Sequence, residues 1–262
     1  MNADGVGGAA SNLDLAIRLA DTAAPIANAY FRTPLDIEAK ADASPVTIAD
    51  KEIEIALRAV LQEAAPDHGI FGEEFGAERL DAEFVWVIDP IDGTRSFSIG
   101  KPLFGTLIGL LHHGEPVLGI IDNPAIGERW IGLKGKPTTF NGQAVSTRPC
   151  PDITQAWMTA TTPHMFLGNN LNAFDNLKTK VRHTIYGCDC NAYGFLANGY
   201  LDLVCEADLK PYDYIALIPV IEGAGGIITD WQGKPLDLNS DGRTVAAGDA
   251  KTHAAALAAL TG

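Results

Sequence analysis

Apolar residues recur at helical spacing in two segments near the start of the chain. In residues 13–31 alanine, leucine and isoleucine return every three or four positions, and Pro34 follows the segment. Residues 47–65 repeat the pattern, and Thr47 and Asp50 have the spacing of a capping box, in which two side chains satisfy backbone groups at a helix start. These patterns predict two amphipathic helices.

Short apolar runs separated by turn residues follow over residues 84–133. The run from Val85 to Ile88 is four residues long, which suits a buried strand. It leads directly into the dipeptides Asp89-Pro90 and Asp92-Gly93, which are both typical of turns. The segment therefore predicts a series of strands with short connections.

From about residue 152 strand-like and helix-like segments alternate, and a single helix is predicted over residues 212–224. Such alternation predicts a layered α/β (α+β) architecture. Residues 148–151 interrupt any regular element, so we expect an N-terminal α+β lobe over 1–149 and a C-terminal α/β lobe over 150–262. With 47% hydrophobic residues, the chain can form a sizeable core in two closely packed lobes or in one domain.

The chain is acidic, with a formal net charge of −14. This charge repels nucleic acid and anionic membranes, so we expect neither as a partner. Residues 1–10 contain no basic side chain, and no apolar run reaches about 18 residues, so the sequence predicts no signal peptide and no membrane span. The four cysteines form no C-x-x-C pair, which favours free thiols in a cytoplasmic protein.

Two adjacent histidines, His112 and His113, stand in a stretch of turn composition. Adjacent side chains on a strand point to opposite faces, which argues against a shared metal ion. We therefore expect an exposed hairpin turn at this point.

Carboxylates follow apolar runs at several places in the chain. Glu73 follows Ile70-Phe71, Asp89 and Asp92 follow the predicted strand, and Asp213 precedes another apolar run. A single carboxylate in such a position is usually solvated surface. Several of them are costly to bring together unless a cation neutralises them, and oxygen ligands are what hard divalent cations require.

These residues belong to motifs that resemble those of the inositol monophosphatase family of magnesium-dependent, lithium-sensitive phosphomonoesterases. The motifs are Gly72-Glu73-Glu74, Asp89-Pro90-Ile91-Asp92-Gly93-Thr94, and Asp213 with Gly223-Ala224-Gly225-Gly226. They occur in the family's order, and the resemblance covers most of the chain. It implies an alternating α-β-α-β-α layered sandwich, as in the inositol monophosphatase and fructose-1,6-bisphosphatase superfamily, and a homodimer.

The resemblance also implies a ligand set for two or three Mg²⁺ ions. The residues it assigns to the metals are Glu73, Asp89, Ile91 through its backbone carbonyl, Asp92 and Asp213. Glu73 and the Thr94 hydroxyl would position the attacking water, and two metal ions would hold the attacking and leaving oxygens in line. Asp50 would border a further, weaker metal site. The alternative for Asp50 is a helix cap without any catalytic role.

Phosphate binding is implied for the turn after the aspartates. The backbone N–H groups of Gly93 and Thr94 would hold the phosphate at the start of a helix, with Arg95 beside them. Lys40 would approach the phosphate, or else be solvated surface. Glu74 is assigned no ligand role, because neighbouring side chains on an extended segment face opposite ways.

Three further strings resemble the histidinol-phosphate phosphatase branch of this superfamily. They are Gly187-Cys188-Asp189-Cys190, Lys210-Pro211-Tyr212-Asp213 and Val220-Ile221-Glu222-Gly223-Ala224-Gly225-Gly226. Asn191 departs from the branch, which often carries an aromatic residue there. Histidinol carries an ammonium group and an imidazole, so its pocket should offer carboxylates. Asp189 and Glu206, with Asp213, are therefore predicted to bind the substrate. The alternatives are a helix cap for Asp189 and a surface charge for Glu206.

The function predicted from these motifs is the Mg²⁺-dependent hydrolysis of histidinol phosphate, a step of histidine biosynthesis. Hydrolysis of inositol phosphate or of another small sugar phosphate is the alternative within the same class of enzyme. A different class is a non-catalytic partner in transcription complexes, as some superfamily members are. That role would not need the metal-binding carboxylates, all of which are present.

Overall fold

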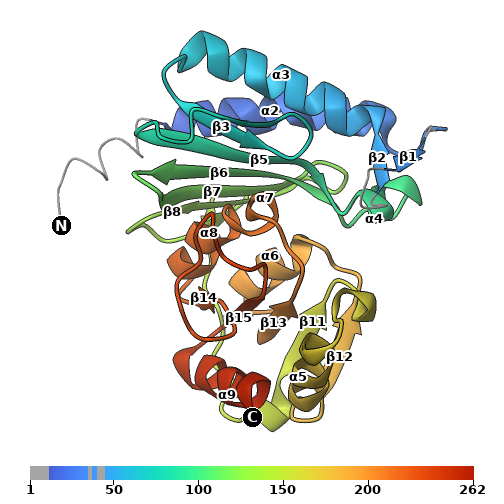
Figure 1. Cartoon of the computed structure of the whole chain (residues 1–262), viewed down its shortest axis with the longest axis vertical. Helices are drawn as coiled ribbons and strands as arrows, with labels where there is room; N and C mark the ends of the chain where they lie inside the picture. Colours follow the sequence, from blue (N-terminus) through green and yellow to red (C-terminus); the bar gives the residue numbers. More distant parts are fainter. Residues whose placement is uncertain (1–11, 35–36, 40–44) are drawn as a thin grey trace.

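Two long helices form the outer layer at one end of the molecule (Figure 1). The computed structural model describes residues 12–34, 37–39 and 45–262. Helix α2 (Leu13–Tyr30) packs against α3 (Ile48–Ala64), and the alanines of α2 that face inward are buried. The predicted capping box is confirmed, because Thr47 and Asp50 bond to each other's backbone groups at the start of α3. Both predicted helices are therefore present.

The second layer is an eight-stranded sheet in the order β10-β9-β8-β7-β6-β5-β3-β4. Its strands are β3 (Gly69–Gly72), β4 (Gly76–Glu78), β5 (Phe84–Asp92), β6 (Gly105–His112), β7 (Glu115–Asn123), β8 (Glu128–Leu133), β9 (Thr139–Phe140) and β10 (Gln143–Ala144). β3 and β5 are parallel, and the other pairs are antiparallel. Helices cover both faces of the sheet, and seven consecutive residues of β5 are accordingly buried.

Three short helices form the middle layer: α6 (Asn191–Ala197), α7 (Pro211–Tyr214) and α8 (Leu217–Gly223). Their approach to the first sheet depends on Gly109, Gly119 and Gly132, which are register partners across β6, β7 and β8. A Cβ atom at Gly119 would lie 1.8 Å from the carbonyl oxygen of Ala216. The row of glycines thus gives the middle helices room against the sheet.

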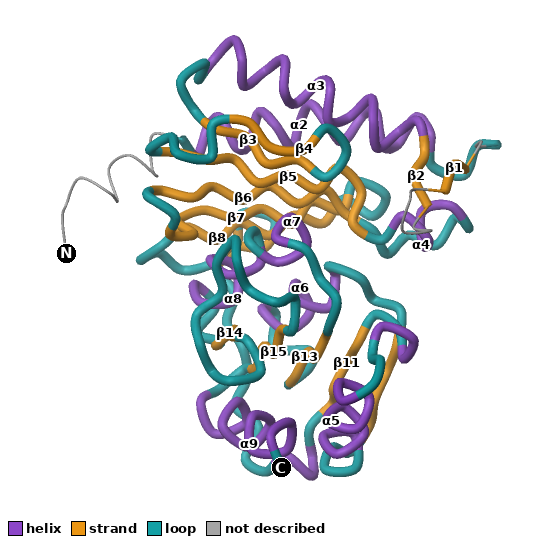
Figure 2. The backbone as a smooth tube through the Cα atoms, viewed as in Figure 1, coloured by secondary structure: helices purple, strands orange, loops and turns teal. Residues whose placement is uncertain are grey.

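The last two layers are a five-stranded sheet and two helices outside it (Figure 2). The strands, in the order β12-β11-β13-β15-β14, are β11 (Trp157–Ala160), β12 (His183–Tyr186), β13 (Leu203–Glu206), β14 (Ile227–Thr229) and β15 (Thr244–Ala247). The helices are α5 (Asn169–Lys178) and α9 (Ala250–Thr261). A separate ribbon pairs β1 (Ile37–Ala39) with β2 (Pro45–Thr47), and α4 (Thr94–Ser98) follows β5. The predicted α-β-α-β-α sandwich is confirmed.

One predicted element is wrong in its boundaries. The helix expected over 212–224 is divided into α7 and α8. Pro219 explains the break, because proline lacks an N–H group for the carbonyl of Ile215 and its ring crowds that carbonyl. The strand β15 and the helix α9, which complete the second sheet and its cover, follow the last element that the sequence pattern predicted.

The division into lobes near residue 150 stays a prediction. The helices of the middle layer follow that boundary, yet they share one buried cluster with the first sheet. In this cluster Val87 and Leu107 of the first sheet pack with Tyr193 and Ile215. The two predicted lobes are therefore closely packed through the middle layer.

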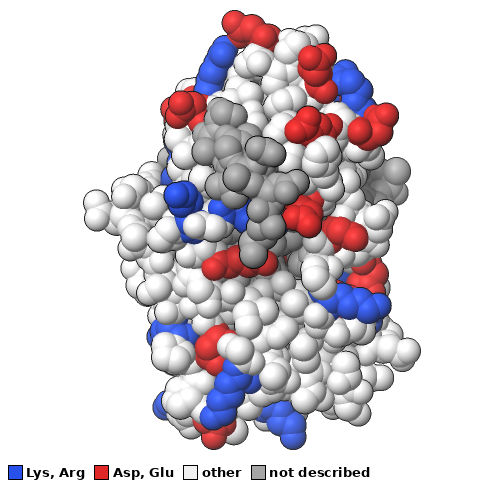
Figure 3. Space-filling model, turned by 90° about the vertical axis from the view of Figure 1, so that its left-hand side faces the viewer, with Lys and Arg blue, Asp and Glu red and all other residues white. Residues whose placement is uncertain are grey.

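Three further expectations concern the surface charge, the membrane and the cysteines. On the face shown in Figure 3, lysine and arginine side chains are spread among acidic and uncharged ones. No helix within the described ranges combines the length and the apolar character needed to cross a bilayer. All four cysteines are free thiols, as expected.

Candidate metal centre and active site

Three aspartates converge where β5 ends and α7 begins. Asp89, Asp92 and Asp213 each offer a carboxylate oxygen, and these three atoms lie within 4.8 Å of one another. In a regular strand, residues three apart face opposite sides. The pairing of β5 with β6 is irregular between Asp89 and Asp92, and such an irregularity redirects the side chains that follow it. The structure thus brings together three of the predicted metal ligands.

Backbone N–H groups fix the orientation of each aspartate. Asp89 accepts a hydrogen bond of 3.0 Å from the N–H of Ile91, and Asp92 accepts one of 2.7 Å from Cys190. Asp213 accepts a hydrogen bond of 2.7 Å from the N–H of Lys210. Each bond uses one carboxylate oxygen, so the direction of the other oxygen is set before any ion arrives.

The electrostatics of this cluster fit a divalent cation. Burial, followed by neighbouring carboxylates, raises the pKa of Asp89 and the pKa of Asp92 well above their ordinary value. Burial is also the main reason why the pKa of Asp213 rises to about 7. The negative charge of Glu73 also raises the pKa of both Asp89 and Asp213, so the fourth predicted carboxylate ligand lies close enough to interact with them. Such a group of acids is stabilised when a cation neutralises it.

Asp50 caps a helix, as one of the two predictions for it requires, while its role at a further metal site stays a prediction. One carboxylate oxygen accepts hydrogen bonds from the N–H and the hydroxyl of Thr47, which is the helix cap. The other oxygen lies 3.5 Å from the hydroxyl of Thr94, which also donates to the carbonyl of Ile91 at 3.1 Å. Burial raises the pKa of Asp50 to about 6. Asp50, Thr94 and the Ile91 carbonyl therefore form one connected group beside the cluster.

The predicted phosphate turn lies between this group and Asp189. Gly93 has a φ of 86°, and a Cβ atom there would lie 3.0 Å from the Cβ of Asp189, so the position requires glycine. α4 begins at the next residue, Thr94. Arg95 is exposed, and its charge partly offsets the rise that burial causes in the pKa of Asp189.

Asp189 does not cap the helix that follows it, so that alternative is wrong. Its carboxylate accepts a hydrogen bond of 2.6 Å from the hydroxyl of Ser96, and the helix α6 has no side-chain cap. Burial raises the pKa of Asp189, and its charge in turn raises the pKa of Asp92. A partly buried carboxylate thus lies next to the metal cluster.

Glu206 is not a surface charge, because it is only 3% exposed at the end of β13. Its carboxylate accepts hydrogen bonds from Thr161 and, at 2.9 Å, from the hydroxyl of Tyr193. Its predicted contact with substrate stays a prediction. Through these bonds Glu206 connects the end of β13 to α6 and to the residue that follows β11.

Two sequence assignments remain, Lys40 and Asn191. Lys40 lies outside the described residues. Asn191, where the sequence departs from the histidinol-phosphatase branch, is fully buried and accepts a hydrogen bond of 2.8 Å from Asn123. It therefore supports the start of α6 from inside.

Sequence reasoning missed Glu54, which supports the segment that carries Glu73. Glu54 is fully buried, and its carboxylate accepts hydrogen bonds from the N–H groups of Glu74 at 2.7 Å and Phe75 at 3.2 Å. Arg58 neutralises it at 2.8 Å. A Cβ atom at Gly72 would lie 1.9 Å from Glu54, so glycine there makes room for the carboxylate. The only signal in the sequence was its position one helical turn after Asp50.

We expect Glu54→Gln to raise the Mg²⁺ concentration needed for half-maximal phosphatase activity by about 10- to 100-fold, the usual effect of losing a group that orients a metal ligand. Much of the turnover should return at saturating Mg²⁺. Glu63→Gln, on the exposed side of the same helix, is the matched control. A lower melting temperature with an unchanged Mg²⁺ requirement would show that Glu54 serves the fold alone.

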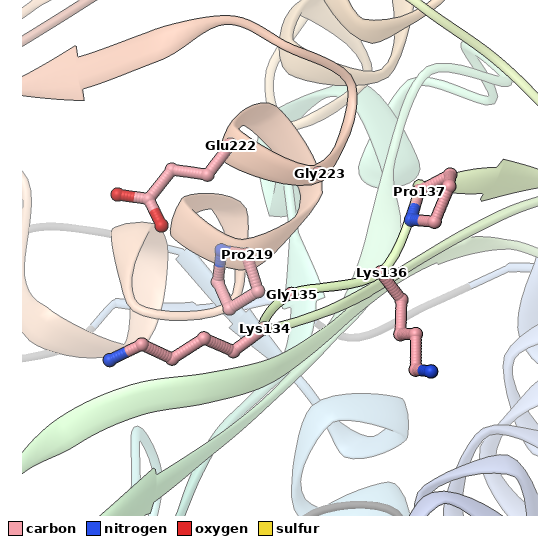
Figure 4. A pocket seen from close by; sticks show the side chains of 7 residues that line it. All are labelled: Lys134, Gly135, Lys136, Pro137, Pro219, Glu222 and Gly223. Carbon is pink, nitrogen blue, oxygen red and sulfur yellow. The ribbon is translucent and has the colours of Figure 1, made fainter. Parts of the chain in front are cut away.

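A cavity of about 270 Å³ lies on another part of the surface and carries no comparable chemistry (Figure 4). Its lining includes Lys134, Lys136 and Glu222, none of them a predicted site residue. The two lysine side chains extend in different directions, and Lys134 pairs with Glu115 at 2.7 Å. The cavity therefore offers no convergent group of charges for an anion.

The layered fold, the converging carboxylates and the similarity to known proteins together show the class of the protein. It is a metal-dependent phosphoric monoester hydrolase. It acts on small phosphorylated substrates. The chain belongs to the inositol monophosphatase family, whose family model matches residues 10–261.

Two relatives and one solved structure are similar to this chain over most of its length. The "Bifunctional phosphatase IMPL2, chloroplastic" of Arabidopsis thaliana is 49% identical over 251 residues, which are 92% of this chain and 72% of that protein. A "Histidinol-phosphatase" of Chlorobaculum parvum is 33% identical over 233 residues, 88% of this chain and 90% of that protein. The solved structure of an inositol monophosphatase from Zymomonas mobilis superposes with a TM-score of 0.89 at 49% identity, covering 96% of this chain and 98% of that one.

Proposed function

We propose that the protein hydrolyses histidinol phosphate to histidinol and phosphate in a Mg²⁺-dependent reaction. The observation that carries this proposal is the partly buried carboxylate of Asp189, held by Ser96 beside the metal cluster. A cationic leaving group gains an ion pair as well as a hydrogen bond from such a carboxylate, whereas a neutral sugar alcohol gains the hydrogen bond alone. The histidinol-phosphatase relative agrees with this substrate.

Each residue of the site has a proposed task in this reaction. Glu73, Asp89, Asp92, Asp213 and the Ile91 carbonyl would hold Mg²⁺, which supplies positive charge against the phosphate dianion and the departing oxygen. The N–H groups of Gly93 and Thr94 would bind the phosphate oxygens. The hydroxyl of Thr94 would orient the attacking water. It would accept a proton from this water while its own proton passes to the Asp50 carboxylate, to which it is connected.

Inositol phosphate hydrolysis is the second candidate function. It is favoured by the 49% identity of this chain to the inositol monophosphatase of Zymomonas mobilis. The Arabidopsis relative is named a bifunctional phosphatase. The metal-binding residues would serve both reactions equally, so the leaving-group side decides between them.

A phosphate-release panel on the purified protein with Mg²⁺ tests the proposal. We expect kcat/KM for histidinol phosphate to exceed that for inositol 1-phosphate by at least about tenfold, because only the ammonium group adds an attraction of opposite charges to the hydrogen bond with Asp189. Equal kcat/KM values for the two esters, or a higher value for inositol 1-phosphate, would contradict the proposal and favour the second candidate function. No turnover of any ester would favour a binding role, which pull-down with RNA polymerase would test.

We also propose a homodimer. Apolar side chains are exposed around a hollow at one edge of the second sheet, among them Trp157, Ile185 and Tyr200, and a second copy of the chain would cover them. Light scattering should give a mass of roughly twice 27.8 kDa at micromolar concentration, and the mass of one chain would contradict the dimer. A cytoplasmic location stays a prediction, since the name of the Arabidopsis relative places that protein in the chloroplast.

A further inference from the structure

The hairpin between β6 and β7 brings the two adjacent histidines together. The connecting turn has two residues, His113 with a φ of 49° and Gly114 with a φ of 81°. Two positive φ values in a row are typical of a type I′ turn, which matches the twist of the strands that it joins. Because His113 has left-handed backbone geometry, its ring does not alternate with that of His112, and the ring centroids lie 4.4 Å apart. The expected hairpin turn is confirmed, although the two rings do not point to opposite faces as they would on a regular strand.

A carboxylate from Glu83, the residue just before β5, lies beside the two histidines. The Oε1 atom of Glu83 lies 3.2 Å from Nε2 of His112. The N–H of His113 donates to the backbone carbonyl of Glu83 at 2.8 Å, which ties the turn to this strand. One ligand atom from each of the three residues lies within 4.8 Å of the other two.

Packing already restricts the orientation of one ring. His112 pairs with Phe84 in the register of β5 and β6, and its ring stacks on that of Phe84 with centroids 4.6 Å apart. Glu83 and His113 are exposed, so their side chains can adjust. Two ligand atoms of a tetrahedral zinc site lie about 3.4 Å apart, given bonds of about 2.0–2.2 Å. The pair of His112 and Glu83 is therefore near this spacing.

We propose that Glu83, His112 and His113 form a Zn²⁺ site separate from the catalytic metals. Two imidazoles and one carboxylate are the ligand set that favours zinc over Mg²⁺, whose ligands are oxygen atoms. Three protein ligands leave a fourth position for water. The site lies at the opposite end of β5 from Asp92, about 26 Å away at roughly 3.3 Å per residue. It does not depend on the proposed phosphatase substrate.

Calorimetric titration of the full chain with ZnCl₂, in excess Mg²⁺ to occupy the carboxylate cluster, tests the proposal. We expect one saturable zinc site per chain in the unaltered protein. His113→Asn should weaken it by at least about tenfold, because loss of a supporting group alone typically costs 10- to 100-fold in affinity. Asparagine is chosen because it tolerates the left-handed conformation and so preserves the turn.

The matched control is His183→Asn, which removes an exposed histidine that packs on Trp157 away from the hairpin. This variant should bind zinc as the unaltered protein does, and Mg²⁺-dependent phosphatase activity should be the same in both variants. Circular dichroism and melting temperature establish that His113→Asn remains folded. Zinc binding that His113→Asn leaves unchanged, or the absence of a saturable site in the unaltered protein, would overturn the proposal.

Discussion

Asp92→Asn is expected to lower kcat by on the order of 10³-fold, equivalent to about 4 kcal/mol, while the protein stays folded. The side chain keeps its shape and can still accept the hydrogen bond from Cys190, but it loses the charge that a metal ligand needs. Removing one of three converging carboxylates also relieves repulsion among Asp89, Asp92 and Asp213. The melting temperature of the metal-free variant should therefore equal or exceed that of the metal-free unaltered protein.

Thermal unfolding and phosphate release, each with EDTA and with Mg²⁺, measure the two effects together. Mg²⁺ should raise the melting temperature of the unaltered protein and have a much smaller effect on Asp92→Asn, because a ligand stabilises only the state that binds it. Asp175→Asn, on the exposed surface of α5, is the matched control. Full turnover after EDTA treatment would exclude the metal-dependent reaction.

Asp189→Asn is expected to lower kcat/KM for histidinol phosphate by about 10- to 150-fold. This range corresponds to roughly 1.5–3 kcal/mol for a partly shielded charge-assisted hydrogen bond between the carboxylate and the substrate ammonium. Hydrolysis of glycerol 2-phosphate, whose leaving group is uncharged, should change much less. The asparagine can still accept the hydrogen bond from Ser96, so the local structure should be retained.

Glu206→Gln provides the comparison, because the two carboxylates differ in what already binds them. Glu206 accepts hydrogen bonds from Thr161 and Tyr193, so its loss should affect stability in addition to any effect on substrate. If it contacts the ammonium as predicted, Glu206→Gln will reduce histidinol phosphate turnover selectively. Equal losses on both esters in the two variants would mean that these acids serve the metals or the fold, and the histidinol assignment would lose its physical support.

The motifs around the metal cluster are short, and the sequence therefore predicted their arrangement well. Asp89, Asp92 and Thr94 lie within six residues, so a strand that ends in a turn brings them close whatever surrounds it. Asp213 is distant in the sequence, and it was the family resemblance that joined it to the others. The structure brings Asp213 to the cluster, while the ligand roles themselves stay predictions.

Features that depend on the order of the strands were not predictable in this way. Glu54 lies off the apolar stripe of its helix, and only the position of the loop after β3 shows that it is buried and bonded to Glu74 and Phe75. The meeting of His112 with Glu83 likewise depends on neighbours in space.

The sequence by itself determined the class of fold, the two long helices, the strands of the first sheet between residues 84 and 133, and the acids of the metal cluster, because each follows from local periodicity or from a short motif. Only the tertiary structure decided how Asp189 is held, how Glu54 supports the Glu73 segment, and how Gly109, Gly119 and Gly132 admit the middle helices. The physical reason is that a periodic pattern specifies which side of an element is apolar. It does not specify which distant segment will pack there, and burial, hydrogen bonding and charge are all set by that partner.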